Sequence, residues 1–353
     1  MARSANRNPS WPNIFRFFTV LCAVMYLLAL QGAAESSSAA ADQVYGVYQC
    51  CTLWVFPALF LLWGLTALED SRAGDLGGMA LGYLLPAFVT LIVWTALYAL
   101  LSTLLGGGTP SLWGFAEQLR QAPTGATLSH LRLLYPLMGL YLVLPVLRRF
   151  VAAADRWEVL YFLLLSLIFV CVLPVWAELR PGDVVPVLLT RMQVHLVLGY
   201  AGCFVGGWYL GHYTLSRISE FLLYILGVAG LVLTFLGPRV LGGSDELWRS
   251  PLSPGVLFTA VGLAVLFRYV LGISDERSRR QEVRSLGGFA FGIYLFHQIW
   301  VLVFRWFGIT VTDLPAPFGP ALFALLFFVL SIPFAWLIAR IPGAGRYLMA
   351  DSP

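Results

Sequence analysis

The chain has 353 residues, of which 59% are hydrophobic and only 11% are charged, and its mean hydropathy is +0.81. Soluble domains carry about 25% charged residues, so this composition excludes a soluble globular protein. The net charge is +4, and all 22 cationic side chains are arginines. Lipid must therefore cover most of the outer surface.

Ten apolar segments are long enough to cross a bilayer, which takes about 17–25 helical residues. The first, residues 13–30, contains an arginine and lacks a short hydrophobic core, so we expect a retained span rather than a cleaved signal peptide. The others follow at residues 47–68, 81–104, 131–147, 159–177, 194–210, 221–236, 255–271, 289–307 and 321–341.

These segments predict an all-α fold, a polytopic transmembrane bundle of about ten helices. We expect an N-terminal tail at residues 1–12, a single transmembrane domain at 13–341 and a C-terminal tail at 342–353. No separate soluble domain is expected, because the segments between the spans are short to medium in length.

The arginines predict the orientation in the membrane. If the N-terminus is cytoplasmic, 15 of the 22 arginines lie on the cytoplasmic side. The remaining seven lie on the other side: Arg120, Arg132, Arg180, Arg191, Arg239, Arg249 and Arg305. Cytoplasmic loops carry an excess of arginine and lysine, so we expect both termini to be cytoplasmic.

A few polar side chains lie within or beside the spans, where a central charge costs about 2.5–3.5 kcal/mol. Arg16 can bind a carboxylate or phosphate. Alternatively, it only extends its charged group to the membrane–water interface. His130, at an outer helix end, can act as an acid or base, or be a plain interface residue. His297 lies in FGIYLFHQIW, either hydrogen-bonded in the core or lining a cavity, with Tyr294 on the same face.

The stretch GYAGCFVGGWYLG, residues 199–211, is rich in glycine, and three of its glycines, Gly202, Gly206 and Gly207, predict a close contact between helices. His212 follows this stretch and is expected at the interface. The five cysteines have no zinc-site spacing, and no phosphate-loop, hydrolase or dinucleotide motif is present. We therefore expect neither a metal nor a nucleic-acid partner.

Four segments, in this order and spacing, resemble the membrane acyltransferase family 3, the O-acyltransferases of bacterial surface polysaccharides. Residues 14–30 and 56–69 are similar to the family's first two helices. The stretch SHLRLLYPLMGLYLVLPVLRRF, residues 129–150, is similar to a family segment that begins at a histidine. LGGFAFGIYLFHQIWVL, residues 286–302, is similar to the family signature Phe-Gly-Ile-Tyr-Leu-x-His.

The resemblance implies a multi-pass acyltransferase of the bacterial inner membrane. It would move an acyl group, expected to be acetyl, from acyl-CoA to a hydroxyl of a surface polysaccharide or its lipid-linked precursor, without a metal. The bilayer, the glycan acceptor and polysaccharide synthase subunits are the expected partners. Arg16 would contact the donor, while His297, the expected base, and His130 line the reaction path. The expected substrate contacts are Tyr294, Tyr141 and Tyr26.

Two positions depart from the family pattern. The family's first-helix arginine is followed, eleven positions later, by a histidine about 16 Å along the same helix face. Here Arg16 is followed by Leu27, and Trp63 replaces the serine before Gly64. These departures leave open a catalytically silent relative in a polysaccharide synthesis or export complex. A small-molecule transporter is a further alternative, disfavoured because intramembrane carboxylates and inverted repeats are lacking.

Overall fold

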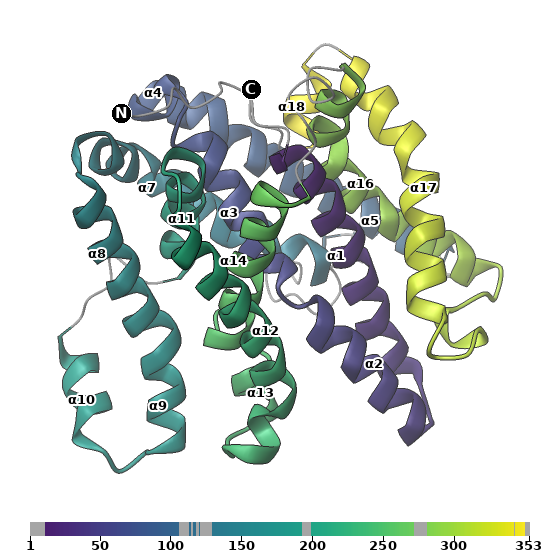
Figure 1. The fold of residues 1–353 in the computed structure, drawn as a ribbon. Coiled ribbons are helices and arrows are strands. Elements are labelled where there is room, and N and C mark those ends of the chain that lie inside the picture. The colour runs from purple at the N-terminus through teal and green to yellow at the C-terminus, as the bar shows by residue number, and fades with distance from the viewer. Residues whose placement is uncertain are drawn as a thin grey trace. The chain divides into compact units, whose positions relative to one another are not determined.

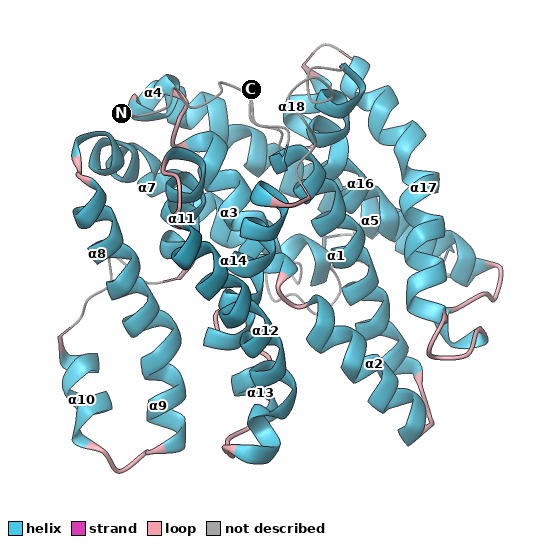
Figure 2. Ribbon diagram, in the orientation of Figure 1, coloured by secondary structure: helices cyan, strands magenta, loops and turns pink. Residues whose placement is uncertain are grey.

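The computed structural model describes residues 11–105, 113, 116–117, 120, 129–192, 199–271, 281–341 and 343–349. Over these residues the chain consists of helices and connecting loops, without a strand (Figure 2). Eight of the described helical segments are long and apolar enough to cross a membrane. The predicted all-α, polytopic bundle is therefore confirmed.

The two remaining predicted spans are shorter helices in the structure. Residues 255–271 correspond to a helix at Pro254–Tyr269. Residues 194–210 lie partly outside the described residues, and their described part belongs to a helix at Ala201–His212. The predicted N-terminal tail also lies outside them, except for its last two residues, which begin the first helix.

The chain divides into two compact units, each assembled from three separate stretches. Unit 1 comprises Met1–Thr19, Cys50–Asp75 and Val143–Arg284, and unit 2 comprises Val20–Gln49, Leu76–Leu142 and Ser285–Pro353. Four helices contribute residues to both units: α1 (Trp11–Glu35), α2 (Ala39–Thr52), α7 (Leu134–Ala153) and α16 (Gln281–Trp306), of which only residues 281–284 belong to unit 1.

Unit 1 contains the middle of the chain, and α12 and α14 run side by side within it (Figure 1). Besides its parts of α1, α2, α7 and α16, its elements are α3 (Val55–Ala67), η1 (Ser71–Gly74), α8 (Arg156–Ser166), η5 (Leu167–Val172), α9 (Leu173–Leu179), α10 (Val184–Arg191), α11 (Ala201–His212), α12 (Arg217–Val240), α13 (Asp245–Trp248) and α14 (Pro254–Tyr269). Polar side chains cap the start of several of them. Asp155 forms a capping box with Glu158 at α8, while Ser216 and Ser253 accept backbone hydrogen bonds at α12 and α14.

Glycines bring α3 and α11 of unit 1 into backbone contact. A Cβ on Gly207 would lie 1.8 Å from the carbonyl oxygen of Leu61, and one on Gly64 would lie 1.9 Å from that of Phe204. A Cβ on Gly202 would lie 2.0 Å from Oγ of Ser166. The predicted close contact is thus confirmed at Gly202 and Gly207. Gly206 differs, since its nearest neighbours would be side-chain carbons at 3.4 and 3.6 Å.

Unit 2 combines parts of α1, α2 and α7 with the C-terminal helices. Its further elements are α4 (Leu76–Met79), η2 (Ala80–Leu84), α5 (Leu85–Leu105), η4 (Ser129–Leu133), most of α16 (Gln281–Trp306), η6 (Val311–Asp313), α17 (Gly319–Arg340) and α18 (Ala344–Leu348). Leu28 of α1, Val301 of α16 and Phe327 of α17 belong to one buried apolar cluster. This packing fixes α16, which carries His297, between two other membrane helices.

The described part of the predicted C-terminal tail, residues 343–349, packs against α5 and α16. Nε1 of Trp94 donates a hydrogen bond to the carbonyl oxygen of Leu348 at 2.6 Å, and Oγ1 of Thr90 donates one to that of Tyr347 at 2.8 Å. Met349 is buried, and its sulfur lies where a side chain on Gly292 would otherwise project. The end of the described chain is therefore part of the core of unit 2.

Candidate functional site

Two histidines that are 167 positions apart in sequence meet in unit 2. His130 comes from the short 3-10 helix η4, and His297 from the middle of α16. Their ring centroids are 5.8 Å apart and the ring planes are nearly perpendicular, at 83°. The structure thus brings together two of the three residues that the sequence suggested for catalysis.

Tyr294 holds both histidines in place. Its hydroxyl donates a hydrogen bond to the backbone carbonyl oxygen of His130 at 2.8 Å. Its own carbonyl oxygen contacts Nδ1 of His297, one turn further along α16. A carbonyl oxygen only accepts hydrogen bonds, so Nδ1 carries the proton in this arrangement. In the neutral ring Nε2 then presents its lone pair and can serve as a base.

Both Nε2 atoms are buried without a partner. His297 is 0% exposed and His130 is 2% exposed. Among the described residues, neither Nε2 has a hydrogen-bond partner. A buried polar atom left in this state costs about 1–3 kcal/mol, so it needs an explanation. Accepting a proton from a substrate hydroxyl is one function that such an atom can perform.

Tyr98 of α5 completes the cluster and was not predicted from the sequence. Its ring meets that of His130 edge-on, with centroids 4.7 Å apart, and its hydroxyl donates a hydrogen bond to the carbonyl oxygen of Leu295. In the sequence, the only feature that could have pointed to Tyr98 is an aromatic hydroxyl within an apolar segment. The chain has 15 tyrosines, so this feature does not single out Tyr98. The cluster therefore draws on α5, η4 and α16.

The other predicted site residues occupy different places. Tyr26, half-buried on α1, lies near enough to Tyr294 for an electrostatic interaction. Tyr141 is buried on α7 and packs edge-on against Tyr83, with centroids 5.3 Å apart. Arg16 is half-buried on the part of α1 that belongs to unit 1. Among the described tyrosines, Tyr294 contacts both histidines.

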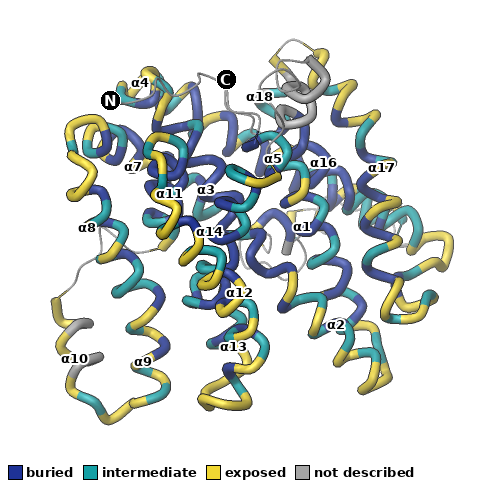
Figure 3. The backbone as a smooth tube through the Cα atoms, viewed as in Figure 1, coloured by how far each residue is buried: buried dark blue, intermediate teal, exposed yellow. Residues whose placement is uncertain are grey.

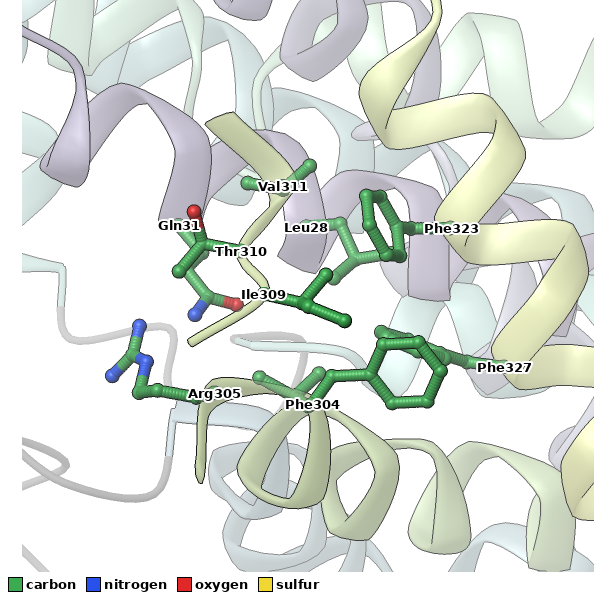
Figure 4. A pocket seen from close by; sticks show the side chains of 10 residues that line it. Leu28, Gln31, Phe304, Arg305, Ile309, Thr310, Val311, Phe323 and Phe327 are labelled. Carbon is green, nitrogen blue, oxygen red and sulfur yellow. The ribbon is translucent and has the colours of Figure 1, made fainter. Parts of the chain in front are cut away.

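A small cavity lies near the end of α16 in unit 2 (Figure 4). Apolar side chains such as Leu28 and Phe327 surround it, and Gln31 and Arg305 lie at its polar side. Its volume is about 10 Å³, roughly one water molecule. Arg305 forms an ion pair with Glu35 beside it. This cavity is too small for an acyl donor and marks a packed end of the unit.

A second cavity, in unit 1, has a volume of about 660 Å³. It is lined mainly by leucines and glycines of α8, α11 and α12, with Arg156 and Tyr209 among its few polar residues. Pockets of about 300–1,000 Å³ are typical of small-ligand sites. Neither cavity is lined by His130 or His297.

Comparison with known proteins identifies one family. A family model described as an acyltransferase domain matches residues 10–340, which covers nearly the whole chain. No curated protein matches the chain, and no solved structure does. The match includes every residue of the histidine cluster as well as Arg16.

Proposed function

The chain belongs to the membrane acyltransferase family 3, and we propose that it transfers an acyl group from a cytoplasmic acyl-CoA to a hydroxyl of a bacterial surface polysaccharide or its lipid-linked precursor. It is a multi-pass membrane protein with an acyltransferase domain. The observation that carries the proposal is the buried pair of imidazoles, each with an Nε2 that has no hydrogen-bond partner among the residues the structure describes. Acetyl is the expected acyl group, and the inner membrane the expected location.

His297 is the proposed general base. Its Nδ1 donates to the carbonyl oxygen of Tyr294, which leaves the Nε2 lone pair for the proton of the acceptor hydroxyl. The hydroxyl oxygen then bonds to the acyl carbon and the carbon–sulfur bond breaks. The thiolate of CoA leaves and takes up the proton from Nε2, so that the ring returns to its starting state. His130, with its ring 5.8 Å away, lines the same path.

Arg16 is the proposed contact for the donor. Family resemblance supports this role, and a guanidinium suits the phosphates of CoA because it offers several donors in a fixed plane. Leu27 stands where the family has its first-helix histidine, and this side chain is buried. A base at His297 would make that histidine dispensable.

Substrate must reach atoms that are closed off in this structure. His297 has no exposed surface, and Tyr98 and Tyr294 pack against the pair. The proposed reaction therefore requires an opening that exposes Nε2 of His297. Such openings are common where an enzyme must exclude water from a reactive intermediate.

A transfer assay tests the proposal. Purified protein is given radiolabelled acetyl-CoA and membranes that bear the host glycan. We expect label on the glycan with the wild type, and loss of transfer with His297→Ala and Arg16→Ala. His212→Ala is the matched control, since this exposed imidazole of unit 1 stacks on Trp208 at 4.7 Å. Solute uptake into proteoliposomes without transfer would point to a transporter.

A catalytically silent subunit is the second candidate, and Leu27 favours it. In that case the wild type would transfer no label and would copurify with a polysaccharide synthase. The variant Leu27→His separates the two candidates further. Gain of transfer in this variant alone would show that the chain lacks only its first-helix base, and would remove His297 from that role.

A further inference from the structure

The large cavity of unit 1 is apolar along its length and polar at one end. Leu163 of α8, Val170 of η5 and Leu223 of α12 contribute carbon surface to it, while Arg156 and Tyr209 also line it. Arg156 is the first residue of α8, and Val170 lies 14 positions further along the same continuous span. At the α-helical rise this is about 21 Å, and one leaflet of the hydrocarbon core is about 15 Å thick. The lined stretch is therefore longer than one leaflet is thick, which is enough to hold an acyl chain along it.

The cavity lies between helices that face lipid. The spans that contain α8 and α12 are the least buried of the eight, at 28% and 22%. Exposed apolar side chains such as Leu164 and Phe221 lie along them, as the yellow segments of α8 and α12 indicate (Figure 3). A lipid chain could enter sideways from the bilayer without crossing a polar barrier.

The polar end has the charge that an anionic headgroup needs. Nε of Arg156 donates a hydrogen bond to the hydroxyl of Tyr209 at 3.0 Å, and the guanidinium lies 5.6 Å from the ring centroid of Tyr213. This bond uses Nε, so the four Nη hydrogens are left for other acceptors. Arg268 does not line the cavity, but its guanidinium donates to the carbonyl oxygen of the same Tyr213 at 3.0 Å.

The neighbouring carboxylates of Asp155 and Glu158 keep their charge, but neither residue lines the cavity, and both side chains accept hydrogen bonds from backbone amides at the start of α8. Asp155 accepts hydrogen bonds from the amides of Trp157 and Glu158, and Glu158 accepts one from the amide of Asp155. The predicted orientation places this end on the cytoplasmic side, where anionic lipids attract arginines.

We propose that this cavity binds one anionic glycerophospholipid of the cytoplasmic leaflet, with an acyl chain along α8 and α12 and its phosphate on Arg156. The binding does not depend on the acyltransfer reaction. The charge of the headgroup should decide which lipid is bound. A zwitterionic lipid with the same acyl chains carries no net negative charge to pair with Arg156.

Native mass spectrometry of the intact protein in detergent tests this proposal. The protein is equilibrated with equimolar phosphatidylglycerol and phosphatidylcholine. We expect one retained phosphatidylglycerol, and Arg156→Gln to lower the preference for it about fivefold. Arg217→Gln is the control, because this arginine is 92% exposed, pairs with Glu220 and does not line the cavity.

Filling the cavity gives an independent test. Leu163→Trp should abolish retention, while Leu164→Trp, next to it on the lipid-facing side, should not. If Leu163→Trp does not fold, Leu223→Trp against Phe221→Trp makes the same comparison on α12. Equal retention of both lipids, retention by the filled variants, or displacement of phosphatidylglycerol by a polyprenyl phosphate would each overturn the proposal.

Discussion

The two units differ in their buried polar atoms and in their cavities. In unit 2, two imidazole nitrogens are buried without a hydrogen-bond partner among the described residues. In unit 1, Nε of Arg249 is a buried side-chain nitrogen without a hydrogen-bond partner among the described residues. Carbon surface of unit 1 lines a cavity of about 660 Å³ that has a guanidinium at one end. The imidazole pair of unit 2 lacks hydrogen bonds that its nitrogens could form, and the cavity wall of unit 1 lacks van der Waals contacts that a filled core would have. Each arrangement lowers the free energy of unfolding and so needs a functional reason. The proposed reasons are catalysis in unit 2 and the binding of a lipid acyl chain in unit 1.

The prediction with the largest expected effect tests whether the buried imidazole of His297 in unit 2 takes part in catalysis. His297→Phe keeps an aromatic ring but removes the proposed base. We expect the rate of acyl transfer to fall by about 10²–10⁴-fold, the usual contribution of a general base. The melting temperature should change little, because the loss of the hydrogen bond from Nδ1 to Tyr294 offsets the removal of an unpartnered nitrogen that costs about 1–3 kcal/mol.

Initial rates and thermal unfolding in detergent measure both quantities on the same sample. His212→Phe serves as the control in unit 1. A variant that transfers acyl groups at the wild-type rate would exclude His297 as the base. A sharp drop in melting temperature would show that this ring is a structural core residue.

The second prediction tests the close contact between α3 and α11, the helix that forms part of the wall of the unit 1 cavity. In Gly207→Ala the new Cβ would lie 1.8 Å from the carbonyl oxygen of Leu61, so α3 and α11 would have to separate. We expect a loss of about 1–3 kcal/mol in the free energy of unfolding, as in other overpacked cores. Gly206→Ala, with its nearest neighbour at 3.4 Å, should change it by less than about 0.5 kcal/mol. Equal melting temperatures for the two variants would contradict this account of the α3–α11 contact.

Much of the fold follows from the sequence because lipid imposes one simple condition. A segment inside the bilayer must be apolar and must satisfy its own backbone, so a long apolar run becomes a helix. This reasoning located the eight long spans and, through small residues, the contact at Gly207. It did not predict the docking of residues 344–349 in unit 2, because that depends on hydrogen bonds from Thr90 and Trp94, over 250 positions away.

The candidate site was predictable only in part. His130, His297 and Tyr294 stand out because polar groups are rare in spans and because the family resemblance includes them. Their mutual contacts are not encoded locally, since they join η4 to α16 across more than 160 positions. Tyr98 was missed for the same reason, because its role depends on where α5 packs.

The smallest predicted effect concerns positioning in unit 2. Tyr294→Phe removes the hydrogen bond to the carbonyl oxygen of His130, worth about 0.5–1.5 kcal/mol. If that bond holds the His130 segment against His297, kcat should fall by up to about tenfold while KM for acetyl-CoA stays unchanged. Tyr48→Phe is the matched control, since it removes a bond of the same kind to the carbonyl oxygen of Pro317, also in unit 2. An equal fall in both variants would mean that kcat follows the general stability of unit 2, whereas a fall in Tyr294→Phe alone would identify Tyr294 as the residue that orients the histidine pair.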